Sequence, residues 1–439
     1  MASKKTAVRK VLIIGGGFAG LECARKLSND DRFEVTLLDR TNHHLFQPLL
    51  YQVATASLAA PDIARSIRQI LHNAKNVMVL MDEVTAISPT DKTVTGKSGD
   101  VFDYDYLVLA AGAKTGFFGN NQWAEHSLGL KSLADAQNIR RKILSNLERA
   151  ELTKDYAERD RLMTIAIVGG GPTGVELSGA FADLIHRSLK SNFRRIDTSK
   201  LRVILIENSP EILEQYDPEQ SAYAKERLQS LGVEVRNKTR VTDVQKGKLL
   251  FEDGSSLEAE AIVWAAGVEA SPLTRNLGVE TDRSGRVTPN PDLSIPGHPE
   301  IFVAGDLVNM RDRNDQLVPG VAPAAAQMGD HISKLLKEEL RLEGTRFADR
   351  KHGLRPLFKY TDKGMMAIIG KNAAVMKVGK FTMNGFFAWI AWLLVHILFL
   401  IGFRNKLSVL LGWAYAYIVN NPEARIIVHP PASVAPPRM

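Results

Sequence analysis

Short apolar runs alternate with helical patterns along the chain, and one such succession occurs twice. Val11–Ile14 is rich in β-branched residues and precedes a glycine-rich turn and a helical pattern, and Ile165–Val168 begins the same succession. In each copy a further apolar run follows, and it ends in an acid, Asp39 or Glu207. This order predicts two units of strand, turn, helix and parallel strand in one α/β chain.

The likeness between the two copies continues downstream. Lys92–Gly112 has the pattern of strand, turn and two further strands, and Lys248–Gly267 repeats it with a hairpin turn at Asp253–Gly254. The apolar stripe of Pro172–Leu189 predicts a longer helix in the second copy, and Ala134–Tyr156 is expected to form the helix that leads into it. The chain is therefore predicted to contain an internal duplication.

Both turns carry the spacing G-x-G-x-x-G, which has a physical reading. The first glycine permits a tight turn, the second lets a pyrophosphate approach the backbone, and the third lets helix and strand pack closely. The helix N-terminus then favours the anion. The glycines are Gly15, Gly17 and Gly20 in the first copy and Gly169, Gly171 and Gly174 in the second. One such motif could be a turn without a ligand, but two copies with later acids favour two dinucleotide sites.

The two acids bear on which nucleotides bind. Asp39 and Glu207 are each expected to accept hydrogen bonds from a ribose. Glu207 is followed by Asn208 and Ser209 with no adjacent Arg, so a 2′-phosphate would be repelled. The second unit is therefore expected to bind NADH rather than NADPH.

The composition excludes several kinds of redox centre. The chain has 439 residues, 45% apolar and 24% charged, which is typical of globular domains. A single cysteine, Cys23, excludes a disulfide scaffold, a four-cysteine iron–sulfur cluster, a cysteine-rich zinc site and an internal dithiol relay. Cys23 is expected to pack in the core, and we find no convincing metal-ligating cluster or catalytic triad.

The positive charge of the chain lies in its C-terminal part. Phe347–Met439 holds twelve Lys or Arg and three Asp or Glu, and three of the five tryptophans. Phe386–Phe403 lacks charged residues, and Leu407–Val419 is a second apolar stretch. We interpret them as a helical pair lying in one leaflet of an anionic membrane rather than a span, with a buried dimer-forming pair left open. His396 is expected to be a tolerated polar residue, and the tail after His429 is expected to be disordered.

With these motifs in place, the chain resembles the flavoproteins that have two dinucleotide-binding domains. Ile301–Asp306 matches their late strand, whose Asp binds the ribityl chain of FAD. Within that group it is most similar to type II NADH dehydrogenase, through Asn42–Leu50, Trp264–Val268 and the apolar C-terminal extension. The resemblance implies that FAD and NADH bind, that hydride passes to the flavin, and that two electrons pass to a membrane quinone without proton pumping.

The resemblance also implies site residues. In the FAD unit these are Gly15, Gly17, Phe18, Ala19, Gly20, Asp39, Arg40, Pro48, Val84, Ala111, Gly112, Gly305 and Asp306. In the NADH unit these are Gly169, Gly171, Thr173, Gly174, Glu207, Ala266 and Gly267.

Three residues are expected to serve catalysis. Glu176 is a candidate proton relay in the first turn of the second nucleotide helix, although Glu22 holds the same place in the first copy. Lys363 matches a family lysine at the flavin edge, although the interpretation as an ordinary surface lysine is slightly favoured. Gln327 matches the second glutamine of the quinone signature A-Q-x-A-x-Q, whose first glutamine is replaced by Pro323.

The expected fold is α/β, with two Rossmann-like dinucleotide-binding domains and a C-terminal membrane-anchoring helical region. Residues 1–115 and 280–330 are assigned to the FAD domain, 116–279 to the NADH domain and 331–439 to the anchor. Expected partners are a membrane quinone, an anionic lipid surface and a second copy of the chain, with no nucleic acid. The protein is expected on the cytoplasmic side of the cell inner membrane, held peripherally.

Two alternatives remain at this point. A soluble ferredoxin or rubredoxin reductase would share both nucleotide folds but would leave the apolar C-terminal stretch without purpose. A flavin-bearing interaction protein that binds nucleic acid is permitted by the sequence pI of 9.3.

Overall fold

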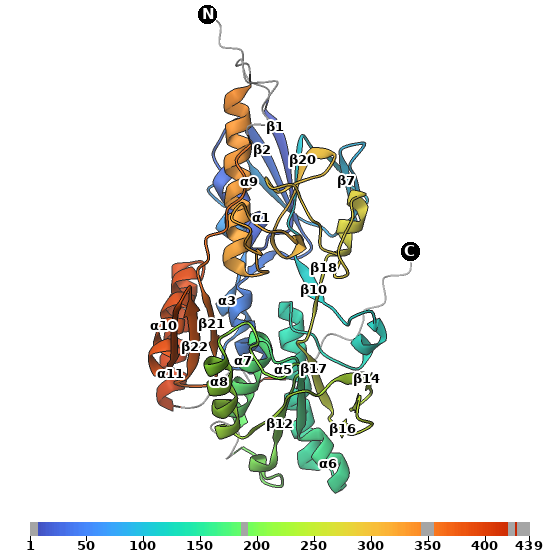
Figure 1. The fold of residues 1–439 in the computed structure, drawn as a ribbon, viewed down its shortest axis with the longest axis vertical. Coiled ribbons are helices and arrows are strands. Elements are labelled where there is room, and N and C mark those ends of the chain that lie inside the picture. The colour runs from blue at the N-terminus through green and yellow to red at the C-terminus, as the bar shows by residue number, and fades with distance from the viewer. Residues whose placement is uncertain (1–7, 186–191, 344–354, 420–425, 428–439) are drawn as a thin grey trace, which may run out of the picture. The chain divides into compact units, whose positions relative to one another are not determined.

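The computed structural model describes residues 8–185, 192–343, 355–419 and 426–427, and these form two compact units. Unit 1 comprises Met1–Leu45, Ala64–Gly116 and Val268–Lys363. Unit 2 comprises Phe46–Ile63, Phe117–Gly267 and Gly364–Met439. Figure 1 labels the elements of both, and each unit is described by itself.

A six-stranded sheet lies at the centre of unit 1, in the order β19–β20–β9–β1–β2–β5. Its strands are β1 (Arg9–Ile14), β2 (Phe33–Asp39), β5 (Val77–Met81), β9 (Tyr106–Leu109), β19 (Ser294–Ile295) and β20 (His298–Val303). All neighbours are parallel except β19 and β20. The four residues of β9 are all buried, as expected for a parallel strand covered on both faces.

Helices α1 (Phe18–Leu27) and α9 (Ala322–Leu342) pack against each other in unit 1 (Figure 1). Their approach is close, because a side chain at Gly329 of α9 would collide with the carbonyl oxygen of Ala19 in α1. The smaller elements of the unit are β3 (His43–Leu45), β4 (Ala64–Ser66), α4 (Ile67–Ile70), β6 (Val84–Ser88), β7 (Thr93–Gly96), β8 (Val101–Asp103), β10 (Ala113–Thr115), β18 (Val268–Ala270), η5 (Pro272–Leu277) and η6 (Gly305–Leu307).

Unit 2 repeats the strand arrangement of unit 1. Its parallel sheet has the order β13–β12–β11–β17, which matches β5–β2–β1–β9. The strands are β11 (Thr164–Val168), β12 (Arg202–Ile206), β13 (Val233–Arg236) and β17 (Ala261–Trp264). The antiparallel sheet of β14 (Val241–Gln245), β15 (Lys248–Phe251) and β16 (Ser256–Glu258) corresponds to β6–β7–β8. The predicted duplication is confirmed.

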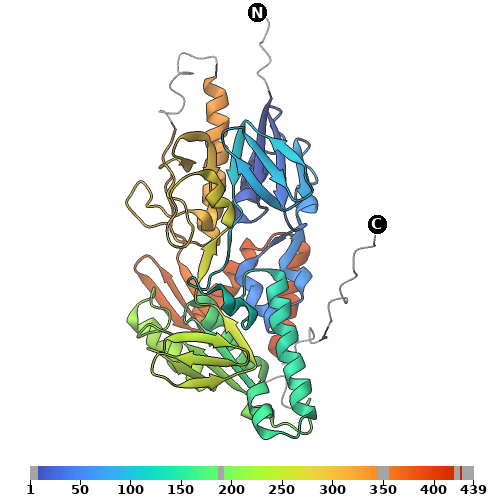
Figure 2. The same cartoon turned by 90° about the vertical axis from the view of Figure 1, so that its right-hand side faces the viewer.

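The helices of unit 2 include a segment from early in the chain. They are η1 (Gln47–Leu49), α2 (Leu50–Ala54), α3 (Ala60–Ile63), η2 (Asn121–Glu125), α5 (Leu133–Leu152), α6 (Tyr156–Leu162), α7 (Pro172–Asp183), η4 (Thr198–Lys200) and α8 (Pro218–Ser230). Helix α2 packs against α5 and α7, and Figure 2 shows the blue early segment beside the long blue-green α5.

Two predicted helices differ from those observed. The helix expected over Ala134–Tyr156 is α5, which ends at Leu152, because Asp155 caps a separate helix α6 by accepting hydrogen bonds from the N–H groups of Ala157 and Glu158. The stripe expected to reach Leu189 forms α7 as far as Asp183, and Leu189 itself lies outside the described residues.

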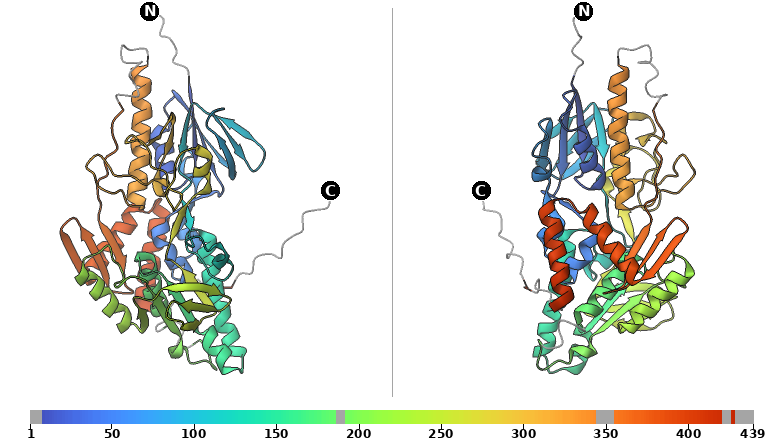
Figure 3. Two further views of the ribbon diagram at one scale, coloured as in Figure 1. Left: turned by 45° about the vertical axis from the view of Figure 1, so that its right-hand side comes forward. Right: turned by 90° about the vertical axis from the view of Figure 1, so that its left-hand side faces the viewer.

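The C-terminal part of unit 2 is only partly helical. An antiparallel sheet of β21 (Met365–Ile368), β22 (Ala374–Val378) and β23 (Phe381–Gly385) precedes α10 (Phe386–Phe399) and α11 (Phe403–Val419). The right panel of Figure 3 shows α10 and α11 as two red helices. Within the described ranges, no helix combines the length and apolar character needed to cross a bilayer.

The two units divide the chain differently from the expected domains. The boundary expected at residue 331 falls inside α9, which stays in unit 1 because it packs on α1. Residues 46–63 belong to unit 2, because α2 packs there. The predicted C-terminal helical region therefore begins at Phe386, after a sheet that the sequence did not indicate, and the tail after His429 lies outside the described residues.

Candidate functional site

The first glycine loop connects β1 to α1 and leaves open space above a helix N-terminus. Gly15 has φ +102°, a left-handed conformation, and a side chain there would collide with the backbone of Ala110. Gly17 is the N-cap of α1 and has no side-chain cap. It is exposed, and a side chain there would meet no atom within 4 Å. A pyrophosphate fits these features, since it could approach the uncapped N–H groups at Gly17.

The second loop, from β11 to α7, has the same geometry. Gly169 has φ +112° and lies against the backbone of Ala265 and Ala266. Gly171 is the N-cap of α7, also without a side-chain cap, and a side chain there would again meet nothing within 4 Å. Pro172 occupies the first helical turn, as predicted. In each unit, the helix that follows the glycine loop therefore has an open N-terminus of the kind that binds dinucleotides.

The two acids bind the loops themselves. Asp39 Oδ2 accepts a hydrogen bond from the N–H of Gly16 at 2.6 Å, and Glu207 Oε2 accepts one from Gly170 at 2.5 Å. The ribose contacts expected of both acids stay predictions. The middle glycines were not among the expected site residues, although three consecutive glycines occur in both copies.

A second segment of unit 1 meets the first loop. A side chain at Gly305, two residues after the end of β20, would lie 3.5 Å from Cβ of Ala325 in α9 and 3.9 Å from Cβ of Ala19 in α1. Asp306 follows in η6, and α9 also starts without a side-chain cap. Gly305 and Asp306 therefore lie where the first turns of α1 and α9 come together, as a flavin nucleotide site would require.

Some of the remaining expected cofactor residues lie at the loops and others lie away from them. Ala111 and Gly112 follow the carboxyl end of β9, and Ala266 and Gly267 follow that of β17. Ala111 lies against Gly15, and Ala266 lies against Gly169. Arg40 and Thr173 are exposed beside the two loops. Val84 is buried at the start of β6, in a sheet separate from the one that carries the loop, and Pro48 lies in η1 of unit 2.

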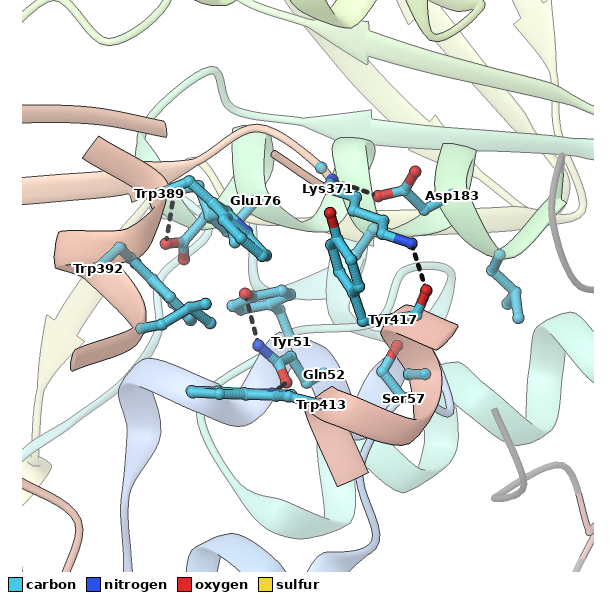
Figure 4. A pocket seen from close by; sticks show the side chains of 16 residues that line it. Tyr51, Gln52, Ser57, Glu176, Asp183, Lys371, Trp389, Trp392, Trp413 and Tyr417 are labelled. Carbon is cyan, nitrogen blue, oxygen red and sulfur yellow. Dashed lines mark hydrogen bonds between the residues drawn. The ribbon is translucent and has the colours of Figure 1, made fainter. Parts of the chain in front are cut away.

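Unit 2 also contains an open cavity of about 160 Å³ (Figure 4). Helices α10 and α11 supply much of its wall through aromatic side chains. The residues that line it are Tyr51, Gln52, Ser57, Glu176, Ala180, Asp183, Leu184, Ile368, Gly370, Lys371, Trp389, Trp392, Leu393, Trp413, Ala416 and Tyr417. The wall is mostly apolar, with few polar groups, which is typical of a site for a small organic ligand.

Glu176 places a carboxyl group in this cavity. It is the fifth residue of α7, so it lies beyond the first turn where it was expected, and no acid occupies that turn. Burial raises the pKa of Glu176 to about 8, and the nearby N–H groups of Ile368 and Trp392 offset part of that rise. The Ile368 N–H lies 3.4 Å from Oε1, whereas the Trp392 indole has no hydrogen bond of ordinary geometry. The carboxyl group therefore holds its proton at neutral pH.

A hydrogen-bonded chain fixes a tyrosine in the same wall. Trp413 Nε1 donates to Gln52 Oε1 at 2.7 Å, and Gln52 Nε2 donates to the Tyr51 hydroxyl oxygen at 2.8 Å (Figure 4). Because the Tyr51 oxygen accepts from Gln52, its own proton is available to another acceptor. The sequence analysis missed Tyr51 and Gln52, which directly follow the Asn42–Leu50 segment and belong to no motif of their own.

Comparison with known proteins identifies the family. Residues 9–329 match the pyridine nucleotide-disulphide oxidoreductase family. A type II NADH:quinone oxidoreductase of Mycobacterium tuberculosis is 42% identical over 420 residues, covering 93% of this chain and 88% of the relative. One from Haemophilus influenzae is 31% identical over 428 residues, covering 89% and 93%. This chain belongs to the type II NADH:quinone oxidoreductases.

A solved structure agrees with the fold. NDH2 of Plasmodium falciparum, determined in complex with NADH, matches with a TM-score of 0.85 at 21% identity, over 96% of this chain and 100% of that one. The predicted α/β flavoprotein fold and the recognised family are thus confirmed.

This type II enzyme lacks the cysteine pair for which the wider family is named. Cys23, its one cysteine, is fully buried in α1, and burial raises the pKa of its thiol to about 12. The packing role predicted for Cys23 is therefore confirmed, and a thiol of this kind is unreactive. Electrons in this type II oxidoreductase cannot pass through a dithiol.

Gln327 and Lys363 are linked through one segment of unit 1. Gln327 in α9 donates from Nε2 to the Thr361 carbonyl at 3.0 Å, and the Thr361 N–H donates to Gln327 Oε1 at 2.8 Å. The amide therefore holds the backbone two residues before Lys363, which is exposed. The structure assigns Gln327 this contact, and a contact with quinone stays a prediction.

His396 is accommodated within α10, as predicted. Its Nδ1 lies 2.7 Å from the Trp392 carbonyl, its ring stacks on Trp392 at 3.9 Å, and burial lowers its pKa to about 4. It is therefore neutral at physiological pH. Across the part of the chain that the structure describes, no group of three His, Cys, Asp or Glu side chains could hold a metal ion.

Proposed function

We propose that the glycine loop of unit 1 holds FAD and that of unit 2 holds NADH, in an enzyme that passes two electrons from NADH to a membrane quinone. The observation that carries this assignment is the duplicated geometry: two open helix N-termini, each next to an acid-bound glycine loop. When bound, FAD supplies the hydride and electron chemistry, so the protein needs no nucleophile of its own. Gly305 and Asp306 beside the first loop support FAD there.

The visible spectrum of the purified protein tests this function. An oxidised flavin band should bleach when NADH is added without oxygen and return when a quinone is added. Recovery with a ferredoxin or rubredoxin and not with quinone would favour the soluble reductase, whose fold is shared at TM-scores of 0.63 and 0.64 by two reductases of that kind. A colourless protein that FAD cannot reconstitute would contradict the proposal.

We further propose that the cavity of unit 2 receives the quinone ring and that Glu176 supplies a proton to it. Reducing a quinone to a quinol consumes two protons, and a carboxylic acid that stays protonated at neutral pH is a suited donor. The apolar wall fits a lipid-soluble ring, and the Tyr51 hydroxyl offers a second hydrogen bond to a carbonyl oxygen.

Lys363 is proposed to face the flavin edge, where its charge would stabilise a reduced ring. This proposal is supported by the position of Lys363, two residues after Thr361, whose backbone Gln327 binds through two hydrogen bonds. Lys363→Ala should slow quinone turnover, and Gln327→Ala should do so more weakly by releasing the segment. Lys359→Ala, an exposed lysine four residues earlier, is the matched control. Equal rates of quinone turnover in all three variants would contradict the roles proposed for Lys363 and Gln327.

The C-terminal helices are proposed to rest on an anionic membrane without crossing it. Their exposed apolar side chains are Phe386, Phe387, Leu394, Leu398, Phe399, Phe403, Leu407, Leu410, Leu411, Tyr415, Tyr417 and Ile418. Aromatic and aliphatic side chains of this kind insert into the interfacial region of a bilayer, and the basic residues of the C-terminal part favour anionic lipid. The cytoplasmic side of the inner membrane is the proposed location.

A homodimer that does not bind nucleic acid completes the proposal, on the resemblance to the family. Light scattering in detergent should give a mass near twice 48.4 kDa. Salt-sensitive retention on DNA would instead favour the nucleic-acid-binding alternative.

A further inference from the structure

In the two glycine loops, equivalent carbonyl groups accept hydrogen bonds from different kinds of donor. In the second loop, the Leu213 N–H donates to the carbonyl oxygen of Gly170 at 2.8 Å. In the first loop, Nδ1 of His44 lies 3.0 Å from the carbonyl oxygen of Gly16. A carbonyl oxygen only accepts hydrogen bonds, so His44 must carry its proton on Nδ1. A side chain in unit 1 thus does what the main chain does in unit 2.

His44 is held firmly in this position. It lies in β3, is 2% exposed, and meets the Phe18 ring edge-on with centroids 5.0 Å apart. Burial lowers the pKa of His44, which favours the neutral ring. Its Nε2 has no hydrogen-bond partner within the described residues, which leaves the bond to Gly16 as the polar contact of the ring.

This bond sets the direction of the next N–H group. The C=O of Gly16 and the N–H of Gly17 belong to one planar trans peptide and point in opposite directions. Because His44 holds the oxygen, the Gly17 N–H is turned away from the imidazole. Gly17 is the N-cap residue of α1, and among the described residues its N–H has no acceptor. Asp39 fixes the preceding peptide through the Gly16 N–H.

We propose that His44 is a positioning residue for FAD, which aims the Gly17 N–H at the pyrophosphate. The inference rests on FAD binding at the first loop, as proposed above. It predicts that loss of the Nδ1 donor weakens the hold on FAD and leaves NADH binding at the second loop unchanged, since there a main-chain N–H makes the bond.

Three substitutions separate the donor from the bulk of the ring. His44→Asn places an amide nitrogen where Nδ1 stood, the same number of bonds from Cα. His44→Leu keeps a similar size without a donor. His43→Leu is the control, since the neighbouring His43 bonds Asn42 and not the loop.

The readout is the rate at which full-length holoprotein releases FAD into the filtrate after dilution. His44→Leu should release FAD at least about ten-fold faster than the unaltered protein, as expected when a buried carbonyl loses its donor. His44→Asn should stay within about three-fold, and His43→Leu should be unchanged. NADH affinity, measured by titration, should be the same in all four proteins.

The proposal is overturned if His44→Leu releases FAD at the unaltered rate, or if His44→Asn releases it as fast as His44→Leu. Should His44→Leu not fold, His44→Gln replaces it, because its amide is displaced by one methylene. Fast release from Gln and slow release from Asn supports the role, and equal rates overturn it.

Gly17→Val tests the placement of FAD separately. Its side chain would fill the space above the loop and should abolish FAD binding. If Gly17→Val keeps FAD, the placement and the role of His44 both fall. If it loses FAD while both His44 variants retain it normally, only the role of His44 falls.

Discussion

If Glu176 is the proposed proton donor, quinone reduction should be sensitive to pH. Because the pKa of Glu176 is raised to about 8, its proton is present at neutral pH and lost above that value. Quinone turnover should therefore decline as pH rises through about 8. Glu176→Gln should lower turnover at pH 7 by about 100-fold and abolish this decline.

The reduction of bound flavin by NADH, followed in a stopped-flow instrument, should be little changed in Glu176→Gln. Glu22→Gln is the matched control, since Glu22 holds the equivalent place in the first copy and pairs with Arg25 and Lys26 at the surface. A pH profile that is the same with and without the Glu176 carboxyl group would exclude it as the proton donor.

The same carboxyl group should affect stability in a pH-dependent way. Its pKa in the folded chain lies above the ordinary value of 4.5. Its contribution to the free energy of unfolding is therefore fully present below pH 4.5 and is lost as the pH rises towards about 8. Glu176→Gln cannot ionise. As the pH rises from 5 to 8, the melting temperature of this variant should therefore increase relative to that of the unaltered protein. A constant difference across this range would show that the folded chain does not disfavour the ionised form.

At this scale the sequence revealed the residues whose roles follow from chain geometry. Glycine spacing and the two acids predicted both loops, because a tight turn and a close helix start leave few choices of residue. It did not reveal His44, whose partner Gly16 lies 28 residues away and is reached only after folding. It also did not reveal Tyr51, because a bond to the neighbouring Gln52 follows no known motif. Asp39 and Glu207 also accept hydrogen bonds from their glycine loops. The sequence analysis expected only ribose contacts for them and did not predict these bonds.

Between elements, the contact of α9 with α1 depends on one small residue. Gly329→Ala would push its side chain into the Ala19 carbonyl, so unit 1 should lose about 1–3 kcal/mol of stability and release FAD faster. Gly412→Ala in α11 is the control, because its side chain would make an ordinary contact with Leu58 at 3.7 Å. As a helical glycine with room, it should gain about 0.5–1 kcal/mol. Calorimetry of both variants measures the effects, and equal shifts would contradict the close packing.

The elements that the sequence predicted well are those with strong local signals. The buried parallel strands are continuous apolar runs next to glycine turns, so β1, β11, β9 and β17 were expected where they lie. The sheet β21–β23 was missed, because its strands have only four or five residues each. They also lie next to a long apolar stretch that dominated the interpretation. The break between α5 and α6 had a signal, the cap at Asp155, that periodicity alone overlooks.

Across the whole chain, the order of the two nucleotide units could be predicted, but the membership of two segments could not. Residues 46–63 and 331–342 join the units on which α2 and α9 pack, and that choice depends on contacts far apart in sequence. The place of the C-terminal helices also depends on contacts far apart in sequence. Trp392 in α10 is fully buried and lines the cavity, so these helices are part of unit 2 as well as the proposed membrane contact.

Membrane binding should therefore be tested without removing the helices, since a deletion would also remove part of the cavity wall. The triple variant Phe387→Ser, Leu398→Ser and Phe403→Ser changes three side chains that are 74%, 70% and 82% exposed. It should keep its flavin and reduce a water-soluble quinone normally, yet fail to float with anionic vesicles, because interfacial binding scales with buried apolar area. The control changes Val101, Leu152 and Leu317 to Ser, which are 62%, 72% and 61% exposed elsewhere. Flotation of both variants to the same extent would mean that α10 and α11 do not hold this protein on the membrane.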